Sequence, residues 1–463
     1  MKSFLSYLIL FCFQANVLFA QLKSDSIIVK AKVWSKDENK QVHYSDWQDY
    51  PSITLNQKGL NKVQQIEKDK YGGVGTGYAV KGFFYTQKIN GRWNVINPLG
   101  HITYITAVNA IRTSKSSELP SKFKDNDDWA KQTLDSINSF GFNTAGCWSD
   151  IDAIIKYNST AQKPIIYTLQ LSLLSGYVSE AKKKDADRKG TSSLGFILDD
   201  EFPLFCDQRA SKLIATKDDP NLLGFFSDNE IGFTNSELKE IISKSNTNDK
   251  AYQKLLEWLP KGTSPENMSN EQKQSFIALF AAKYYEVVSK AIKKYDNHHL
   301  YIGSRIHSNA KNNPYLFKAA NPYLDIISIN YYGDWKPKQS YLDDWASWSD
   351  KPFFITEFYT KAEETGMSNL SGAGWIVKTQ KDRGIHFQNF CMQLLQSKNC
   401  VGWHWFRYQD NDPNDAKADD SNKDSNKGIV NLNYEFYTVL TQMMKELNTN
   451  VYQLIHYFDT IQK

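Results

Sequence analysis

The sequence has little cysteine, and its cysteines follow no metal-binding pattern. Only five occur in 463 residues, no two of them have C-x-x-C spacing, and the eight histidines supply no ligand spacing either. We therefore expect no metal site. We expect Cys147, Cys206, Cys391 and Cys400 to be buried free thiols, with a Cys391–Cys400 disulfide as the alternative.

The glycine-rich and serine motifs of several enzyme classes are also missing. The sequence contains no P-loop, no Gly-x-Gly-x-x-Gly turn after a first strand and no Gly-x-Ser-x-Gly nucleophile turn. These absences argue against a nucleotide-dependent enzyme, a dinucleotide-dependent oxidoreductase and a serine hydrolase of the α/β type. We expect no cofactor.

An excess of charge of one sign is absent as well. Lys and Arg number 55 and Asp and Glu 51, which gives a net charge of +4, and the only tight basic cluster is at 182–184. A nucleic-acid-binding protein would need a basic stripe. We expect no nucleic-acid partner. No internal apolar run is long enough to span a bilayer.

The one long apolar run stands at the N-terminus. Lys2 precedes the apolar stretch 4–19, and Ala20-Gln21 offers a small residue before a polar one. This is the order of the basic, apolar and cleavage regions of a signal peptide. We expect residues 1–20 to be removed, the protein to be exported to the periplasm or the extracellular space, and no membrane span to remain.

Aromatic residues are abundant, at 14% of the chain, with 12 Trp and 26 Tyr. Together with a 41% share of hydrophobic residues they indicate a folded core. Aromatic rings also stack on the C–H faces of sugars. The composition therefore leaves two interpretations open, ordinary core packing and a carbohydrate site.

The order of apolar and helical segments predicts the fold. Residues 21–80 mix short β-prone runs with Lys-rich stretches, which predicts a small N-terminal β-rich extension, and Asn90-Gly91 predicts a hairpin. Eight apolar runs suited to buried strands follow, at 102–107, 142–147, 164–169, 222–227, 300–306, 324–329, 352–356 and 400–406. Helical periodicity is clearest at 127–140, 271–295, 380–396 and 435–447.

Eight strands that alternate with helices are typical of a (β/α)8 barrel of the α/β class. A doubly wound sheet that binds a dinucleotide would need a glycine-rich turn after its first strand, and none follows 102–107. We therefore predict a TIM barrel over residues 81–463. In such a barrel the active site lies at the carboxyl ends of the strands.

Two glutamates follow predicted strands: Glu230 the fourth and Glu357 the seventh. A glycosidase needs such a pair, one carboxyl group to protonate the leaving oxygen and a second to attack or to activate water. We predict Glu230 as general acid/base and Glu357 as nucleophile, about 5–5.5 Å apart, as a double displacement requires. The structural alternatives are a loop-capping role for Glu230 and an ion pair between Glu357 and Arg305.

Further candidates surround the expected active-site mouth. Asn229 can hydrogen-bond to a sugar hydroxyl, and donors on strands five and six can keep Glu357 ionised. Trp403 and Trp405 alternate along the eighth strand and share one face, which predicts a stacking floor beneath the sugar. The predicted substrate-binding residues are Asn229, Arg305, Asn330, Tyr331, Tyr332, Trp375, Trp403, His404 and Trp405.

The loop 409–428 after the eighth strand is rich in aspartate. An EF-hand calcium loop would place oxygen ligands at fixed alternation with a turn glycine, and that spacing is absent. We predict a polar loop that faces substrate, with a solvated surface loop as the alternative. Ion binding by this loop is not decided by the sequence.

Several motifs resemble glycoside hydrolase family 50, the β-agarases. The most specific are Gly372-Ala-Gly-Trp375, Thr379-Gln-Lys-Asp-Arg-Gly384 and Gly402-Trp-His-Trp-Phe-Arg-Tyr408, and Asn229-Glu230 and Glu357 match the glutamate motifs. The resemblance implies retaining hydrolysis of β-1,4-galactosidic bonds in agarose, with Glu230 as acid/base and Glu357 as nucleophile. The sequence departs from the family at Ile96-Asn-Pro-Leu-Gly100, where the pattern is closer to Val-Asp-Pro-Glu-Gly, so a related red-algal galactan stays open.

Two other functions remain as alternatives. One is a β-galactosidase-like exo-hydrolase that acts on other galactan oligosaccharides, and the second is a non-catalytic sugar-binding barrel. A polysaccharide lyase is disfavoured because no basic cluster suited to uronate is evident. The expected partner is in each case a galactan polysaccharide or oligosaccharide.

Overall fold

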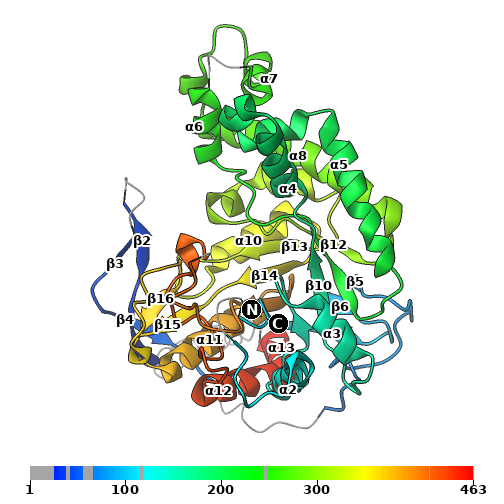
Figure 1. Ribbon diagram of the computed structural model, residues 1–463, viewed down its shortest axis with the longest axis vertical. Helices are drawn as coiled ribbons and strands as arrows, with labels where there is room; N and C mark the ends of the chain where they lie inside the picture. Colours follow the sequence, from blue (N-terminus) through cyan, green and yellow to red (C-terminus); the bar gives the residue numbers. More distant parts are fainter. Residues whose placement is uncertain are drawn as a thin grey trace, which may run out of the picture.

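A computed structural model describes residues 26–37, 42–55, 66–114, 118–244, 248–416 and 418–461. The predicted signal peptide, residues 1–20, lies outside the described residues. The protein is an α/β structure built around one eight-stranded sheet with helices on its outside (Figure 1).

All eight predicted strands form the barrel. Neighbouring strands pair in parallel, in the order β12-β11-β10-β9-β8-β17-β14-β13. Ile306 closes the ring between β12 and β13, because its N–H donates to Ser328 O at 2.8 Å and its O accepts from Asn330 N at 2.9 Å. The predicted TIM barrel is therefore confirmed. Its strands are β8 (Ile105–Val108), β9 (Thr144–Ala145), β10 (Ile166–Gln170), β11 (Leu222–Phe226), β12 (Leu300–Gly303), β13 (Ile327–Asn330), β14 (Phe353–Glu357) and β17 (Cys400–Trp405).

Helices pack around the strands, and several begin where the sequence supplies a cap. Asp125 accepts a hydrogen bond from Asp128 N at the start of α2, and Ser269 and Thr379 form capping boxes that start α8 and α11. The helices are α2 (Asn126–Ser139), α3 (Ile151–Asn158), α4 (Leu173–Lys184), α5 (Glu201–Ala210), α6 (Asn235–Ser243), α7 (Lys250–Trp258), α8 (Asn270–Tyr295), α9 (Pro314–Ala320), α10 (Gln339–Trp348), α11 (Gln380–Leu395), α12 (Thr438–Thr449) and α13 (Val451–Ile461).

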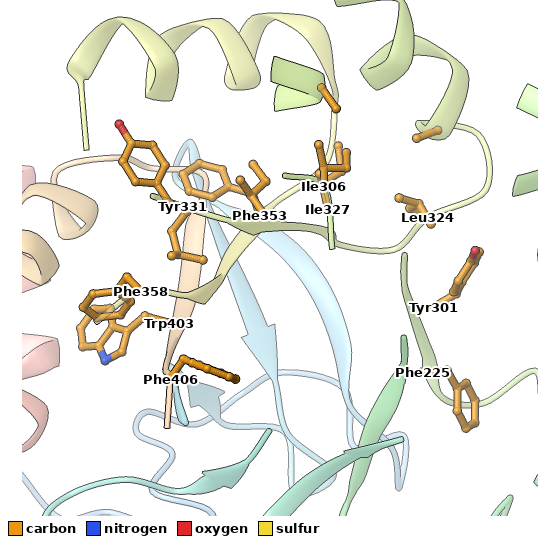
Figure 2. Packing of buried hydrophobic residues seen from close by; sticks show 14 of the residues in the cluster. Phe225, Tyr301, Ile306, Leu324, Ile327, Tyr331, Phe353, Phe358, Trp403 and Phe406 are labelled. Carbon is orange, nitrogen blue, oxygen red and sulfur yellow. The ribbon is translucent and has the colours of Figure 1, made fainter. Parts of the chain in front are cut away.

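The barrel strands bury both of their faces. Ile302 and Phe354 belong to the cluster inside the barrel, whereas Tyr301, Phe353 and Trp403 belong to the larger cluster between strands and helices (Figure 2). Burying one such side chain contributes about 1.5–3 kcal/mol to stability. Because both faces are apolar, the polar residues that carry chemistry are confined to the strand ends.

The N-terminal strands join the loop that follows the seventh barrel strand. β1 pairs antiparallel with β4 on one side and with β16 on the other, and β16 pairs with β15, so the four make one sheet. β2 and β3 form a two-stranded ribbon on the same side of the molecule (Figure 1). The bounds are β1 (Ile27–Lys32), β2 (Trp34–Lys36), β3 (Val42–Tyr44), β4 (Gln48–Ser52), β15 (Thr360–Ala362) and β16 (Trp375–Val377).

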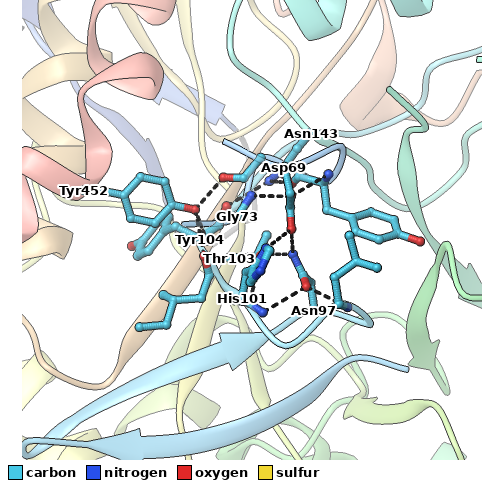
Figure 3. Close-up of polar contacts among 12 residues, drawn as sticks. Asp69, Gly73, Asn97, His101, Thr103, Tyr104, Asn143 and Tyr452 are labelled. Atoms are coloured by element: carbon cyan, nitrogen blue, oxygen red, sulfur yellow. Dashed lines mark hydrogen bonds and ion pairs between the residues drawn. The ribbon is translucent and has the colours of Figure 1, made fainter. Parts of the chain in front are cut away.

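A hairpin and a polar network cover the amino end of the barrel. β5 (Tyr85–Ile89) and β6 (Arg92–Ile96) form the hairpin predicted at Asn90-Gly91, and β6 pairs with β7 (Ile102–Thr103). Beside them, the Asp69 carboxylate accepts from Asn97 Nδ2 and lies 2.7 Å from His101 Nδ1 (Figure 3). This network is far from the carboxyl ends of the strands and holds the chain that enters the barrel.

The four cysteines of the described residues are buried free thiols, as predicted, so the alternative Cys391–Cys400 disulfide is absent. The Tyr104 hydroxyl donates to Cys400 Sγ at 3.4 Å. Among the described residues, none of the helices combines the length and the apolar character that a membrane crossing requires.

Candidate active site

The carboxyl ends of the barrel strands enclose a cavity that contains both predicted glutamates. Glu357 is the last residue of β14, and Glu230 lies shortly after the end of β11. Both line one cavity of about 1050 Å³. The strand count therefore predicts correctly that these two distant residues line one cavity.

Two donors hold the Glu357 carboxylate. Arg305 Nη2 donates to Oε1 at 2.7 Å, and the Tyr332 hydroxyl donates to Oε2 at 2.5 Å. Burial raises the pKa of Glu357 to about 7, the Glu230 charge adds to the rise, and Arg305 and Tyr332 oppose it. The donors expected from the sequence are present, but burial outweighs them and brings this pKa to neutrality.

Asn330, at the end of β13, connects the two glutamates. Its Nδ2 donates to Glu230 Oε1 at 2.7 Å and to Asn229 Oδ1 at 3.3 Å. Its Oδ1 accepts from the Thr356 hydroxyl at 2.8 Å. Because Thr356 immediately precedes Glu357, this one amide fixes Glu230 relative to the strand that carries Glu357.

Asp228 anchors the segment that carries Glu230. Its buried carboxylate accepts from Leu174 N at 2.8 Å, Ser175 N at 3.0 Å and the Tyr284 hydroxyl at 2.7 Å. Two residues later, Glu230 has φ 56°, in the left-handed region that costs a non-glycine residue about 1–2 kcal/mol. The anchor holds this strained backbone, and sequence reasoning missed it although Asp228 stands beside the glutamate motif.

Arg305 is fully buried behind Glu357 and does not line the cavity. Its guanidinium carbon lies 4.4 Å from the centre of the Trp148 ring, and Nη2 also donates to Thr356 O at 3.0 Å. The prediction of a direct substrate contact is therefore wrong for Arg305, because burial keeps substrate from it. The alternative, an ion pair with Glu357, is confirmed at 2.7 Å.

Three other predicted binding residues line the cavity, namely Asn229, Asn330 and Tyr332. Tyr331 does not, and its predicted contact is wrong. Its hydroxyl donates to Asp334 Oδ2 at 2.9 Å and accepts from Lys338 N at 3.1 Å. Tyr331 and Tyr332 are consecutive, but only Tyr332 lines the cavity.

The predicted stacking floor of Trp403 and Trp405 is wrong. Both side chains are 0% exposed, and their rings lie 6.3 and 5.9 Å from the Phe387 ring of α11, on the outer face of the barrel; Figure 2 shows Trp403 in this core. The alternation along β17 is as predicted, but a period of two does not say which face points inward. His404 takes the inward position between them.

His404 and Trp375 also lie outside the cavity lining, so their predicted substrate contacts are wrong. His404 is fully buried, with ring centroids 6.1 Å from Phe226 and 5.7 Å from Phe354, and burial lowers its pKa to about 3. Trp375 packs on Tyr50 at 4.8 Å in the sheet made with the N-terminal strands. Both side chains are part of hydrophobic cores, and the sequence alone does not show which residues those cores contain.

The cavity has an aromatic wall of which the sequence predicted only Tyr332. The rings of Trp148 and Phe406 lie 5.8 Å apart, and those of Tyr332 and Tyr359 lie 5.5 Å apart. Trp34 of β2 lines the same cavity from the N-terminal strands. These rings are the aromatic surface available to a sugar. The signal for Trp148 and Phe406 was their position at the end of a predicted strand, Trp148 directly after 142–147 and Phe406 as the last residue of 400–406.

The Asp-rich loop 409–428 faces the cavity in part, as predicted, because Asp419 and Asp420 line it. Asp410 is instead buried and accepts from Asn426 Nδ2 at 2.9 Å and Gly428 N at 2.8 Å. In the parts of the chain that the structure describes, no group of three or more His, Cys, Asp or Glu side chains is placed to hold a metal ion.

This arrangement defines a class of protein. A (β/α)8 barrel with two glutamates in one cavity at the ends of strands four and seven is the arrangement of glycoside hydrolases that work with a pair of carboxyl groups. One group serves as acid and the other as nucleophile or base.

Comparison with known proteins narrows the class. The solved structure of BpGH50 is 31% identical to this chain, with a TM-score of 0.80, over 94% of this chain and 96% of BpGH50. The agarase AgWH50C is 21% identical, with a TM-score of 0.68 over 86% of this chain and 68% of that one, and so shares the fold. The chain belongs to glycoside hydrolase family 50, the β-agarase family.

Sequence comparison gives a more distant relative of greater length. Beta-agarase B of Vibrio sp. (strain JT0107) is 23% identical over 496 residues, which cover 83% of this chain and 50% of the agarase. The present chain therefore spans about half of the length of that relative. No family model matches the chain.

Proposed function

We propose that this protein is a retaining glycoside hydrolase that cleaves β-1,4-galactosidic bonds in agarose or a related red-algal galactan. The observation that carries the proposal is the single cavity lined by Glu230 and Glu357, with Asn330 bonded to the first and Tyr332 to the second. The names of its relatives, beta-agarase A and beta-agarase B, support the choice of substrate.

The proposed reaction is a double displacement. The Glu357 carboxylate attacks the anomeric carbon of a galactose unit while the Glu230 carboxylic acid protonates the departing glycosidic oxygen. The glycosidic bond breaks and a galactosyl ester of Glu357 forms. Glu230, now a carboxylate, takes a proton from water, whose oxygen attacks the same carbon and releases Glu357, so the product keeps the β configuration.

The neighbouring residues support these steps. Arg305 and Tyr332 orient Glu357 and stabilise its charge, both before attack and when it leaves the ester. Asn229, beside Glu230, can donate to a hydroxyl of the reacting sugar, an interaction that strengthens in the transition state. The rings of Trp148 and Phe406 offer stacking surfaces for the sugar face.

Glu357→Gln and Glu230→Gln test the two roles on a panel of agarose, porphyran and carrageenan. We expect each variant to lose at least about 10²–10⁴ of kcat on whichever galactan the native protein cleaves, because each removes a group that acts on the reacting atoms. Proton NMR of the first product should show the β anomer. Full activity of both variants, or an α product, would contradict the proposal.

The same panel separates the alternatives. Release of single sugar units from chain ends would indicate a β-galactosidase-like exo-hydrolase. Calorimetric binding of an oligosaccharide without any turnover would indicate a sugar-binding barrel. Sizing of the products by chromatography also decides between internal and terminal cleavage.

We propose in addition that the protein is exported to the periplasm or the extracellular space. Lys2 and the apolar stretch 4–19 support this, since they have the order of a signal peptide. Mass spectrometry of the protein recovered after expression with its own N-terminus should show the loss of about 20 residues. Recovery of only the uncleaved chain inside the cell would contradict it.

A further inference from the structure

Three cations gather in one wall of the active-site cavity. Arg112 follows β8, Arg407 follows β17 and Lys427 lies in the loop 409–428, and all three line the cavity that holds Glu357. β8 and β17 are paired neighbours in the barrel, so their carboxyl ends bring the two arginines close together. Arg407 N donates to Lys427 O at 3.2 Å, which fixes the lysine beside them.

One group of this cationic wall (Arg112, Arg407 and Lys427) lacks a hydrogen-bond partner among the described residues. It is Arg407 Nε, which is buried without an acceptor. Lys427 Nζ donates only to neutral groups among the described residues, Ser421 O and Asn422 Oδ1. An unsatisfied buried donor, as at Arg407 Nε, and a buried ammonium that bonds only to neutral groups, as at Lys427, are costly, which favours a ligand that supplies negative charge.

The charges also act on one another. Burial, with Arg407 adding to its effect, lowers the pKa of Lys427 to about 7. Burial, with Arg112 adding, lowers the pKa of Arg407 to about 10. Arg407 is therefore within electrostatic range of both Lys427 and Arg112, and an anion bound beside Arg407 would relieve this repulsion.

Nearby carboxylates are occupied by other partners. Asp420 pairs with Lys423 at 2.9 Å, and Asp419 accepts from Ser421 N at 2.9 Å within its own turn. Asp410 is buried and held by several donors that include the Tyr437 hydroxyl at 2.6 Å. These three carboxylates reduce the positive potential of the cationic wall without bonding to the guanidinium groups. The carboxylates that act on the cationic wall are Asp410, Asp415, Asp419 and Glu357.

We propose that the cationic wall binds an anionic group, a sulfate ester or a carboxylate, carried by the galactan near the cleaved bond. Guanidinium groups pair with such oxygens in a bidentate way. Lys427 Nζ lies 5.2 Å from the centre of the Tyr359 ring and 5.8 Å from that of Phe406, beside the reacting sugar's aromatic wall. The inference rests on the proposed function. It predicts that the preferred substrate is a charged galactan and not a neutral one.

The test measures binding, so that it does not depend on turnover. Isothermal titration calorimetry with the Glu357→Gln variant of the full chain compares three oligosaccharides of equal length: neutral from agarose, sulfated from porphyran, and pyruvylated from agar. We expect one charged sugar to bind at least about tenfold tighter than the neutral one at low salt. The charged sugar that binds tighter identifies the anionic group. Added salt should reduce the preference.

Arg407→Gln and Arg112→Gln, each in the Glu357→Gln background, test the cationic wall. Each should reduce the ratio of charged to neutral affinity at least about fivefold. Arg209→Gln is the matched control, since Arg209 lies outside the cavity, 3.5 Å from Glu180, and should keep the ratio. Thermal unfolding verifies that each variant is folded.

Two results would overturn the inference. One is equal affinity for the neutral and both charged sugars, and the second is a preference that both arginine variants retain. Either result would leave the proposed function standing, because a galactan is still bound. Absence of binding to all three sugars would contradict the proposed function together with this inference.

Discussion

The Tyr332 hydroxyl donates to Glu357 Oε2 at 2.5 Å, from just beyond the end of the strand that pairs with β14. This bond favours the carboxylate form of Glu357 in a site where burial favours the acid form. The resulting pKa of about 7 means that small changes in the neighbouring groups alter the fraction of Glu357 that is ionised near neutral pH. Small changes around it should therefore change the pH dependence of the enzyme.

The acidic limb of the pH profile should depend on Glu357. A nucleophile acts as the carboxylate, so kcat/KM should fall as the pH drops through the pKa of about 7. Tyr332→Phe removes a donor that lowers this pKa, and the limb should move to higher pH. The control Tyr177→Phe removes a hydroxyl bonded to Asp199 at 3.0 Å, outside the cavity, and should leave the limb in place. A limb that does not move in Tyr332→Phe would contradict the assigned role.

The stability of the Glu357→Gln variant should rise relative to the native protein as the pH increases. The folded-state pKa of Glu357 is raised from 4.5 to about 7, so between these values the folded state binds more protons than the unfolded state. Native stability is therefore lost as the pH rises through this window, and Gln does not titrate. Between pH 5 and pH 8 the difference should change by about 2–3 kcal/mol in favour of Gln. Urea unfolding at both pH values measures it, and a constant difference would contradict the burial of the charge.

Trp403 and Trp148 should respond oppositely to truncation. Trp403→Ala removes a 0% exposed side chain from the outer core and should lower the free energy of unfolding by about 3–5 kcal/mol. Trp148→Ala removes a half-buried ring of the cavity wall, and should cost less stability but raise KM about 2- to 10-fold. Urea unfolding measures the stability of the two variants, and steady-state kinetics on one oligosaccharide measures their KM. Equal effects on both quantities would contradict the placement of the two rings.

Trp34 should matter most for long substrates. It belongs to the N-terminal β2 but lines the cavity of the barrel, so it can contact sugars beyond the reacting unit. Trp34→Ala should raise KM several-fold on a hexasaccharide and less on a shorter oligosaccharide, with kcat nearly unchanged, since a lost stacking contact is worth about 0.5–1.5 kcal/mol. Trp47→Ala is the matched control, because Trp47 lies on the same extension, under Lys378, and outside the cavity. Equal effects of the two substitutions would contradict the prediction.

The sequence by itself determined the barrel and the position of its two glutamates. Each strand is a short run that is apolar on both faces, which is what a strand packed between a barrel core and a helix layer requires, and the helices carry their own caps, such as Ser269 and Thr379. These are local properties, so they can be read from the order of residues. A polar residue directly after such a run must then lie at the mouth, as Glu357 does.

Only the tertiary structure decided which side chains share that mouth. Periodicity predicts that Trp403 and Trp405 share one face of the strand, but it does not say whether that face points into the barrel. In the structure both rings pack against the surrounding helices. The pairing of β1 with β16 joins segments hundreds of residues apart, and Arg112 and Lys427, equally distant in the sequence, line one cavity. The burial that raises the pKa of Glu357 to about 7 likewise depends on all of the segments packed around this side chain. Such quantities depend on the closure of the barrel, because only the closed ring fixes which loops stand opposite one another.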